Sequence, residues 1–383
     1  MSLSHYDKYK RRSDKLPTSK TLQEEETTNN HDDNRPCKIR KTSSSITNLS
    51  GDCLNLIFKC LETIYDRNSF GLTCHKWFDI QNNNQESLWY HTSIYARGLS
   101  PEIMCKLLIR FQHLKYLSLR GLPRITDFVT SKSQSFGSNV QTLMLDFCSQ
   151  YSDMQLSLLF SWFPSLTCIR LDYSNIADKG LETLANCCPS LEEVSLQCCY
   201  TITDSGIGFL VQKCRQLRSL DIRYCSSITG ISFLGCAQTL TYLVACGCKI
   251  NPEGINAIVS GGGLEYLCLL TYKEDLAKVG EGCIINTEAV VTISKSCPLL
   301  TRLLLSNCEE VELEGWEAIG LNCKQLKSLF VMGCQKFCDV GLQAICDGCS
   351  NLSELYVDGE KNNISSSALE LFECKKPDVL FLQ

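Results

Sequence analysis

The chain has 383 residues and 44% of them are apolar, which is enough to bury one large core or several small ones. Its net charge of -5 gives no reason to expect binding to nucleic acid or to an anionic membrane, so the expected partner is another protein. The first twenty residues lack the apolar core of a signal peptide, and no apolar run approaches the roughly 18 residues of a membrane span. We therefore expect a soluble protein of the nucleus, the cytoplasm or both.

Residues 1–45 are rich in charged, hydroxyl and amide side chains and hold almost no aliphatic residues, which predicts a disordered polar tail. Two basic clusters lie within it, at residues 8–12 and 38–41. Their spacing loosely resembles a two-part nuclear import signal, but a solvated tail would have the same composition.

Residues 46–90 have the pattern of short amphipathic helices, because apolar residues recur at helical spacing in two runs. The runs are Leu54, Ile57, Phe58 and Leu61, and then Phe70, Cys74, Trp77 and Phe78. A helical module of about 45 residues has little net stability alone, so we expect a partner or a neighbouring domain to cover part of its apolar surface.

The order of residues in this module resembles the F-box family: Leu49-Ser50-Gly51-Asp52, then Leu54, Ile57-Phe58, Leu61, Asp66-Arg67, Cys74-His75-Lys76-Trp77 and Leu88-Trp89. Ser50 stands where the family typically has proline, although a serine still provides a helix cap. The resemblance implies docking on the adaptor that links F-box proteins to a cullin, through the first helix and the turn before it. The residues carried over to that contact are Leu49, Asp52, Leu54 and Ile57, whereas Trp77 looks like module core.

Residues 91–113 are expected to form a linking helix, around 102–111, and the cap of a repeat array. From residue 114 to 383 one template recurs, with apolar residues at strand positions 1, 4 and 6, often cysteine at position 9, and then a helix. Its ten copies begin at Leu114, Val140, Leu166, Leu191, Leu217, Leu240, Leu264, Leu300, Leu326 and Leu352. The steps are 23 to 26 residues except for one of 36, which is typical of leucine-rich repeats with one insertion.

A single unit of this kind cannot bury its own apolar face, so the copies should stack into an α/β solenoid. We expect a leucine-rich-repeat horseshoe with parallel strands on the concave face and helices outside. The repeats resemble the cysteine-containing subclass found in F-box proteins, and the whole chain looks like plant members of that family.

The 26 cysteines raise three alternatives: packing, zinc ligation and thiol catalysis. Eleven follow the repeat period: Cys148, Cys199, Cys225, Cys248, Cys308 and Cys334 at position 9, and Cys188, Cys214, Cys297, Cys323 and Cys349 at helix ends. The remaining Cys346-x-x-Cys349 pair has no second pair or nearby histidine to complete four ligands. This favours reduced thiols that pack in the core, with no metal, no cofactor and no catalytic residues.

Strand positions 3, 5 and 7 should point onto the concave face, where they would select a protein substrate. The row is charged in its first half and largely apolar in its second, and contiguous apolar side chains facing solvent mark interaction sites. The predicted substrate-binding residues are Arg170, Asp221, Arg223, Val244, Leu270, Leu304, Phe330, Met332 and Tyr356, with Tyr272 from the insertion around 271–283. The alternatives are that curvature or the tail covers this strip, that the register is misplaced, or that the insertion is a neutral loop.

The resemblance implies a substrate-recognition subunit of an SCF-type cullin ubiquitin ligase, which brings substrate and ubiquitin-charged enzyme together without chemistry of its own. Its partners would be the adaptor, through it the cullin, and an unidentified protein substrate marked for degradation. Two alternatives stay open: a leucine-rich-repeat scaffold that is not assembled into a ligase, and a small-molecule receptor like the plant hormone receptors.

Overall fold

The computed structural model describes residues 49–91, 101–121, 137–271, 283, 285–357 and 362–382. The chain divides into a first unit that ends at Leu49 and a second that runs from Ser50 to Gln383. All that follows concerns the described residues of the second unit, together with Leu49. The expected polar tail and its two basic clusters lie outside the described residues.

Three short helices form the N-terminal module: α2 (Gly51–Cys60), α3 (Ile64–Gly71) and α4 (His75–Asn84). Ser50, the departure from the F-box pattern, is the N-cap of α2, because its hydroxyl accepts a hydrogen bond from the Cys53 N–H at 3.2 Å. Leu54, Phe58 and Phe70 are buried, and the Phe70 ring stacks on Trp77 with ring centroids 4.3 Å apart. The module therefore has a small aromatic core that includes Trp77, as expected.

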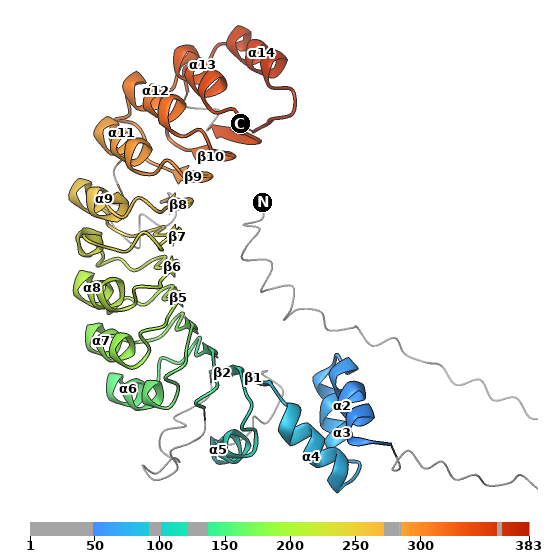
Figure 1. Cartoon of the computed structure of the whole chain (residues 1–383). Helices are drawn as coiled ribbons and strands as arrows, with labels where there is room; N and C mark the ends of the chain where they lie inside the picture. The colour runs from blue at the N-terminus through green and yellow to red at the C-terminus, as the bar shows by residue number, and fades with distance from the viewer. Residues whose placement is uncertain are drawn as a thin grey trace, which may run out of the picture. The chain divides into compact units, whose positions relative to one another are not determined.

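The rest of the unit is a solenoid built on one parallel sheet, in which the described strands lie side by side in chain order (Figure 1). The strands are β1 (Ser87–His91), β2 (Tyr116–Arg120), β3 (Thr142–Met144), β4 (Cys168–Arg170), β5 (Glu193–Ser195), β6 (Ser219–Asp221), β7 (Tyr242–Val244), β8 (Tyr266–Leu269), β9 (Arg302–Leu305), β10 (Ser328–Val331), β11 (Glu354–Val357) and β12 (Leu380–Leu382).

Helices follow the strands and cover the outer side of the curved sheet, while the strands line its inner side (Figure 1). The helices are α5 (Pro101–Arg110), α6 (Asp153–Ser161), α7 (Asp178–Cys187), α8 (Asp204–Lys213), α9 (Pro252–Val259), α11 (Thr287–Ser296), α12 (Leu313–Asn322), α13 (Asp339–Gly348) and α14 (Ser366–Lys375). In the short repeat after β6 a single 3₁₀ turn, η3 (Ile231–Phe233), takes the helix's place. The predicted α/β solenoid is confirmed.

The predicted strand register is confirmed at every pairing between β2 and β11. Position 5 pairs across neighbouring strands in the expected order: Ser118, Met144, Arg170, Ser195, Asp221, Val244, Cys268, Leu304, Phe330 and Tyr356. Leucines and other apolar residues at positions 4 and 6 are buried in one continuous core between sheet and helices. The 36-residue step is also present, since Tyr266 pairs with Arg302.

The sheet has two strands beyond the ten expected. β1 pairs with β2 and contains Leu88 and Trp89, which the sequence pattern had grouped with the helical module. At the other end β12 pairs with β11. β1 stands 29 residues before β2, whereas β12 follows β11 at the regular 26-residue step. Template position 1 is polar in both, Gln85 and Asp378, so the apolar pattern of the template does not reach them.

Two recurring devices hold neighbouring repeats together. The first is an aspartate at the start of a helix whose carboxylate caps the next repeat: Asp178 accepts from the Thr203 N–H at 2.8 Å and from its hydroxyl at 2.6 Å. Asp339 accepts in the same way from Ser365. The second is a left-handed residue that ends the strand at position 8 and turns the chain toward the helix: Gly121, Phe147, Tyr173, Cys198, Tyr224, Gly247, Asn307 and Gly333, with φ between 56° and 70°.

Candidate binding surfaces

The helical module presents several apolar side chains to solvent. Leu56 is 65% exposed, Tyr65 74% and Leu72 86%, and Ile57 is 37% exposed. Such a concentration of exposed apolar groups on helices this short is typical of an interaction surface.

Three of the four predicted adaptor-binding residues are accessible in this arrangement. Ile57 and Asp52 are exposed and Leu49 is half-buried. Leu54 differs from the expectation of an exposed contact residue, because its side chain has no exposed surface and packs inside the module. On a ten-residue helix the apolar spacing that marks one face includes both core and surface positions, and only the packing of α4 on α2 separates them. Leu56 was missed because it lies outside that spacing.

The predicted apolar strip on the concave face is present, but it is less exposed than expected. Val244, Leu270 and Leu304 are each only 6% exposed and form a cluster with Cys246, Tyr266 and Cys268. Phe330 and Met332 pack against this cluster and are half-buried, as is Tyr356. Side chains that project from adjacent parallel strands, about 4.8 Å apart, bury one another. The expectation that the whole strip faces solvent is therefore wrong.

The charged half of the concave face consists of arginines held against buried aspartates. Arg170 lies 2.8 Å from Asp172 and 3.6 Å from Asp146, and Arg120 lies 3.1 Å from Asp146. Burial raises the pKa of Asp146, an effect that the two guanidinium groups oppose. Asp172 also accepts from the Ser195 hydroxyl at 2.6 Å, which links a fourth repeat to the network.

Asp221 and Arg223 form a separate pair on β6 and just after it. The Arg223 Nη2 atom lies 2.6 Å from an Asp221 carboxylate oxygen, and its Nε atom donates to both oxygens. The last predicted contact residue, Tyr272, lies outside the described residues, as does the insertion apart from Thr271 and Cys283 at its ends.

Exposed aromatic residues at the carboxyl ends of β3 to β5 were missed by the sequence reasoning. Phe147 is 52% exposed, Tyr173 42% and Tyr200 62%. Phe147 and Tyr173 stand at the left-handed position 8 and Tyr200 at position 10, whereas the prediction followed only the strand positions 3, 5 and 7. The sequence pattern that could have indicated them is a bulky aromatic residue at position 8, where other repeats have glycine.

The periodic cysteines pack in the core, as the repeat pattern indicated. All eleven are buried, and several at position 9 donate to a main-chain carbonyl of the preceding repeat. Cys199 donates to Leu171 O at 3.1 Å, Cys225 to Leu196 O at 3.1 Å, and Cys248 to Ile222 O at 3.0 Å. Burial raises the pKa of the Cys199 thiol to about 11, which keeps it protonated and poorly nucleophilic. Within the described ranges no group of three or more His, Cys, Asp or Glu side chains is placed to hold a metal.

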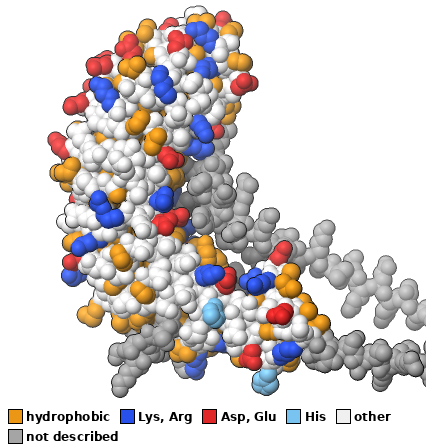
Figure 2. Space-filling view, viewed as in Figure 1, with side chains coloured by type: hydrophobic (Ala, Val, Ile, Leu, Met, Phe, Trp, Pro, Cys, Tyr) orange, Lys and Arg blue, Asp and Glu red, His pale blue; other side chains and the backbone are white. Residues whose placement is uncertain are grey.

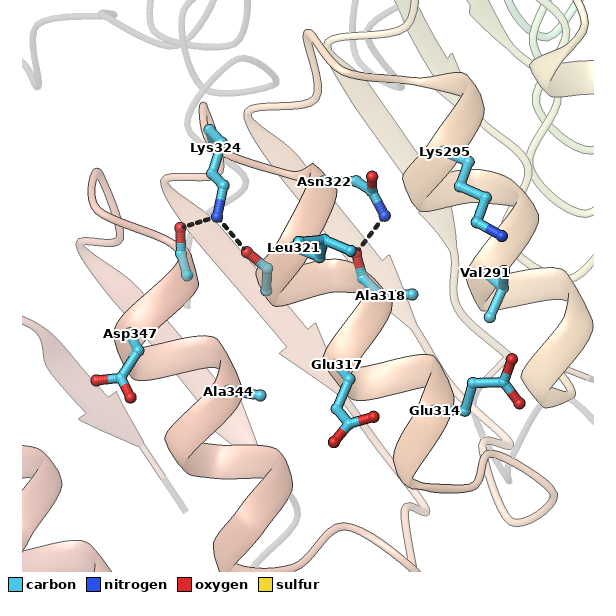
Figure 3. A pocket seen from close by; sticks show the side chains of 12 residues that line it. Val291, Lys295, Glu314, Glu317, Ala318, Leu321, Asn322, Lys324, Ala344 and Asp347 are labelled. Atoms are coloured by element: carbon cyan, nitrogen blue, oxygen red, sulfur yellow. Dashed lines mark hydrogen bonds between the residues drawn. The ribbon is translucent and has the colours of Figure 1, made fainter.

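The outer helices carry a shallow hollow of about 530 Å³ along α11, α12 and α13 (Figure 3). The Lys324 ammonium group donates to the carbonyl oxygens of Gly320 at 2.7 Å and Gly348 at 3.1 Å, and so joins the C-terminal ends of α12 and α13. Charged side chains of both signs are mixed over the visible face of these helices (Figure 2). The hollow has the character of a structural junction between helices.

Among the described helices none is long and apolar enough to cross a membrane.

A family model described as "Leucine Rich repeat" matches residues 164–185, which contain β4 and most of α7.

Two solved structures are similar to this chain at low identity. A TLR13–ssRNA13 complex is 15% identical with a TM-score of 0.47, over 72% of this chain and 40% of that one, so this chain spans less than half of its length. The yeast Rad7 and Elc1 complex is 15% identical with a TM-score of 0.36, over 86% of this chain and 92% of that one.

A curated relative is much closer in sequence. The chain is 40% identical over 286 residues to the "F-box/LRR-repeat protein 12" of Arabidopsis thaliana, and the match covers 67% of this chain and 72% of the relative. This identity extends over more than two thirds of the relative, and the relative's name combines the two parts that the fold displays. The chain therefore belongs to the F-box/LRR-repeat protein family.

Proposed function

We propose that this protein is the substrate-recognition subunit of an SCF-type ubiquitin ligase, acting in the nucleus, the cytoplasm or both. The helical module docks on the adaptor and through it on the cullin, and the inner side of the solenoid holds a protein substrate for ubiquitination and degradation. The protein has no catalytic role, since its contribution to rate is proximity between substrate and ubiquitin-charged enzyme.

The observation that carries the proposal is the exposed apolar face of the module, in a chain whose family is defined by an F-box. A module with so small a core loses stability if this face stays in water, so burial against another protein is favourable. We propose that Leu49, Asp52, Leu56 and Ile57 lie at the adaptor contact. Leu54 contributes only by holding α2 in place.

A specific double substitution tests this assignment. Leu56→Asp with Ile57→Asp places two carboxylates on the docking face, and burying charge at an apolar interface should weaken adaptor binding by at least about 100-fold, or about 2.7 kcal/mol. Because Leu56 is 65% exposed, the fold should tolerate the change there. The measurement is co-purification of adaptor and cullin with the full chain, scored by mass spectrometry.

Leu234→Asp is the matched control, because Leu234 is a 70% exposed leucine on the solenoid. It should leave adaptor capture unchanged. If the wild-type chain captures no adaptor or cullin, the alternative of a leucine-rich-repeat scaffold outside a ligase is correct. If the double variant is folded and captures the adaptor normally, the docking face is elsewhere.

A further inference from the structure

Two exposed aromatic rings stack on one another where β3 and β4 end. Phe147 and Tyr173 occupy the same position of successive repeats, and their rings stack with centroids 4.8 Å apart and an interplanar angle of 10°. They are 52% and 42% exposed, and Tyr200, which follows β5, is 62% exposed. The stacked pair has its own internal contact, yet roughly half of each side chain faces solvent.

The backbone at this position favours glycine, which makes the presence of large rings informative. Phe147 and Tyr173 have φ of 60° and 58°, in the left-handed region. The equivalent residue is glycine in three other described repeats, Gly121, Gly247 and Gly333. Strained conformations of bulky residues concentrate at functional sites. The fold tolerates glycine here, so the turn itself does not require aromatic rings.

The charges beside these rings are arranged with the cations outward. The Arg120 guanidinium lies over the Phe147 ring, 5.7 Å from its centroid. The side chain of Arg120 is 32% exposed and that of Arg170 25%, while those of their partners Asp146 and Asp172 are 2% and 3% exposed. The carboxylates thus lie beneath the surface, and the exposed part of each ion pair is the guanidinium group.

We propose that this surface, which we call the aromatic shelf (Phe147, Tyr173 and Tyr200 with Arg120 and Arg170), binds an extended, acidic segment of a partner protein. Apolar or aromatic side chains of the segment pack against the solvent-exposed parts of the stacked rings, and its carboxylates pair with the guanidinium groups. The inference rests on the proposed function, because it assigns the chemistry of the substrate that the solenoid holds. The four repeats from β2 to β5 span roughly 15 Å, which an extended chain crosses in about five residues.

A nucleic acid strand would also offer negative charge and stacking groups, but the surface disfavours it. The whole chain carries a net charge of -5, which repels a nucleic acid strand with one charge per nucleotide more strongly than a peptide with two or three carboxylates. Asp146, Asp172 and the exposed Glu193 are interspersed with the arginines, so no continuous basic track exists for a phosphate backbone along these strands. A short acidic peptide needs only two cationic positions, and two are present.

The test is a selection of random 16-residue peptides, displayed on phage, against the full chain. We expect the enriched peptides to share two or more Asp or Glu residues next to Leu, Phe, Tyr or Trp. A synthetic copy of the most enriched peptide should bind at least tenfold more weakly to the Phe147→Gly/Tyr173→Gly double variant. Replacing its acidic residues by Gln or Asn should weaken binding to the wild-type chain to a similar degree.

The glycine substitutions keep the test interpretable, because glycine fits the left-handed backbone at both positions. The thermal midpoint of the double variant should stay within about 4 °C of wild type. Met154→Ala, at an 82% exposed residue of α6, is the control and should leave peptide binding unchanged.

Three results would overturn the inference: no peptide enriched, enriched peptides without an acidic bias, or equal binding by the folded double variant. Tighter binding of a 20-nucleotide single-stranded RNA than of any peptide, lost in the double variant, would also overturn it and assign the shelf to nucleic acid. Adaptor capture by the double variant separates this inference from the proposed function. Failure of the peptide test with intact adaptor capture overturns only the shelf, whereas absent adaptor capture by the wild-type chain overturns the ligase role.

Discussion

Removal of a single inter-repeat carboxylate should measurably loosen the solenoid. Asp178 begins α7, and its carboxylate accepts from the main-chain N–H and the hydroxyl of Thr203 in the next repeat, at 2.8 and 2.6 Å. The Thr203 hydroxyl in turn accepts from the Ser205 N–H at 3.2 Å and so caps α8. Asp178→Ala therefore removes an inter-repeat contact and disturbs the start of the following helix.

The expected loss is about 3 kcal/mol. A hydrogen bond to a charged group contributes about 1.5–3 kcal/mol, and Asp178 accepts two in a partly buried place, so their sum is an upper bound. At about 2.1 cal/mol/K per residue, a unit of this size that unfolds together would lose about 4 °C of thermal midpoint. Asp178→Asn keeps one acceptor oxygen for the Thr203 N–H and should lose only about 1 kcal/mol.

Thermal unfolding of the full chain, followed by circular dichroism, measures the loss, and hydrogen exchange should show it concentrated in the first turn of α8. Lys179→Ala is the control on the same helix, because the Lys179 ammonium group pairs with Glu182 across an exposed 2.6 Å contact. Surface pairs of this kind contribute little, about 0–1 kcal/mol. If Asp178→Ala and Lys179→Ala shift the midpoint equally, the reasoning about inter-repeat carboxylates is wrong.

Three further outcomes are expected. Because burial raises the pKa of Cys199 to about 11, Ellman's reagent should modify it only after denaturation, while the exposed Cys374 reacts at once in the native chain. Hydrogen bonds from Ser365 in the next repeat lower the pKa of Asp339 from its ordinary value of 3.8. The stability that these bonds give the folded chain is therefore present above pH 3.8 and is lost as the pH falls through the lowered pKa of the folded state. Asp339→Asn should remove this pH dependence from the hydrogen exchange of the α14 amides. Phe330→Ala should lower the free energy of unfolding by about 1–2 kcal/mol, because the ring is half-buried. Leu329→Ala should lower it by about 2–5 kcal/mol, because Leu329 is fully buried, and urea unfolding measures both losses.

The register of the solenoid could be predicted because two independent periods agree. Alternation with period two fixes which side chains of a strand face the core, and the 26-residue step repeats the same assignment from strand to strand. One slipped residue would move charged side chains such as Asp221 into the apolar core, so the pattern leaves little freedom. The end strands β1 and β12 have weaker support, because Gln85 and Asp378 stand at position 1, where the ten copies of the template have an apolar residue.

Exposure on the inner face could not be predicted in the same way. Position 5 points inward in every repeat, yet Val244 is almost fully buried while Phe330 is half-buried. The difference depends on the size of the side chains on adjacent strands, here Tyr266 and Leu270, and on how closely they approach. Sequence shows which residues share the face, but the area left to solvent follows only from the packed structure. The same limit applies to Leu54 and Leu56 on α2.

The connection between module and solenoid bears on how such a protein could serve as a receptor. The Arg110 guanidinium on α5 lies 3.8 Å from the Phe78 ring centroid and donates to Asn82 at 2.6 Å and to Gln81 at 2.8 Å, both on α4. The strand that follows α4, β1, pairs with β2 through five residues. Movement of the module against the first repeats would break these contacts together, because a planar guanidinium satisfies three partners in only one orientation.

Proximity raises the rate of a reaction only when the distance between the two bound groups is restricted. A substrate held at the aromatic shelf would lie on β2 to β5, the repeats that continue directly from this junction. A substrate held at the apolar strip on β7 to β11 would be separated from the junction by several more repeat interfaces, each with its own small flexibility. The aromatic shelf thus lies on the repeats whose distance from the docking module is most restricted. The apolar strip lies on repeats whose distance from that module is less restricted.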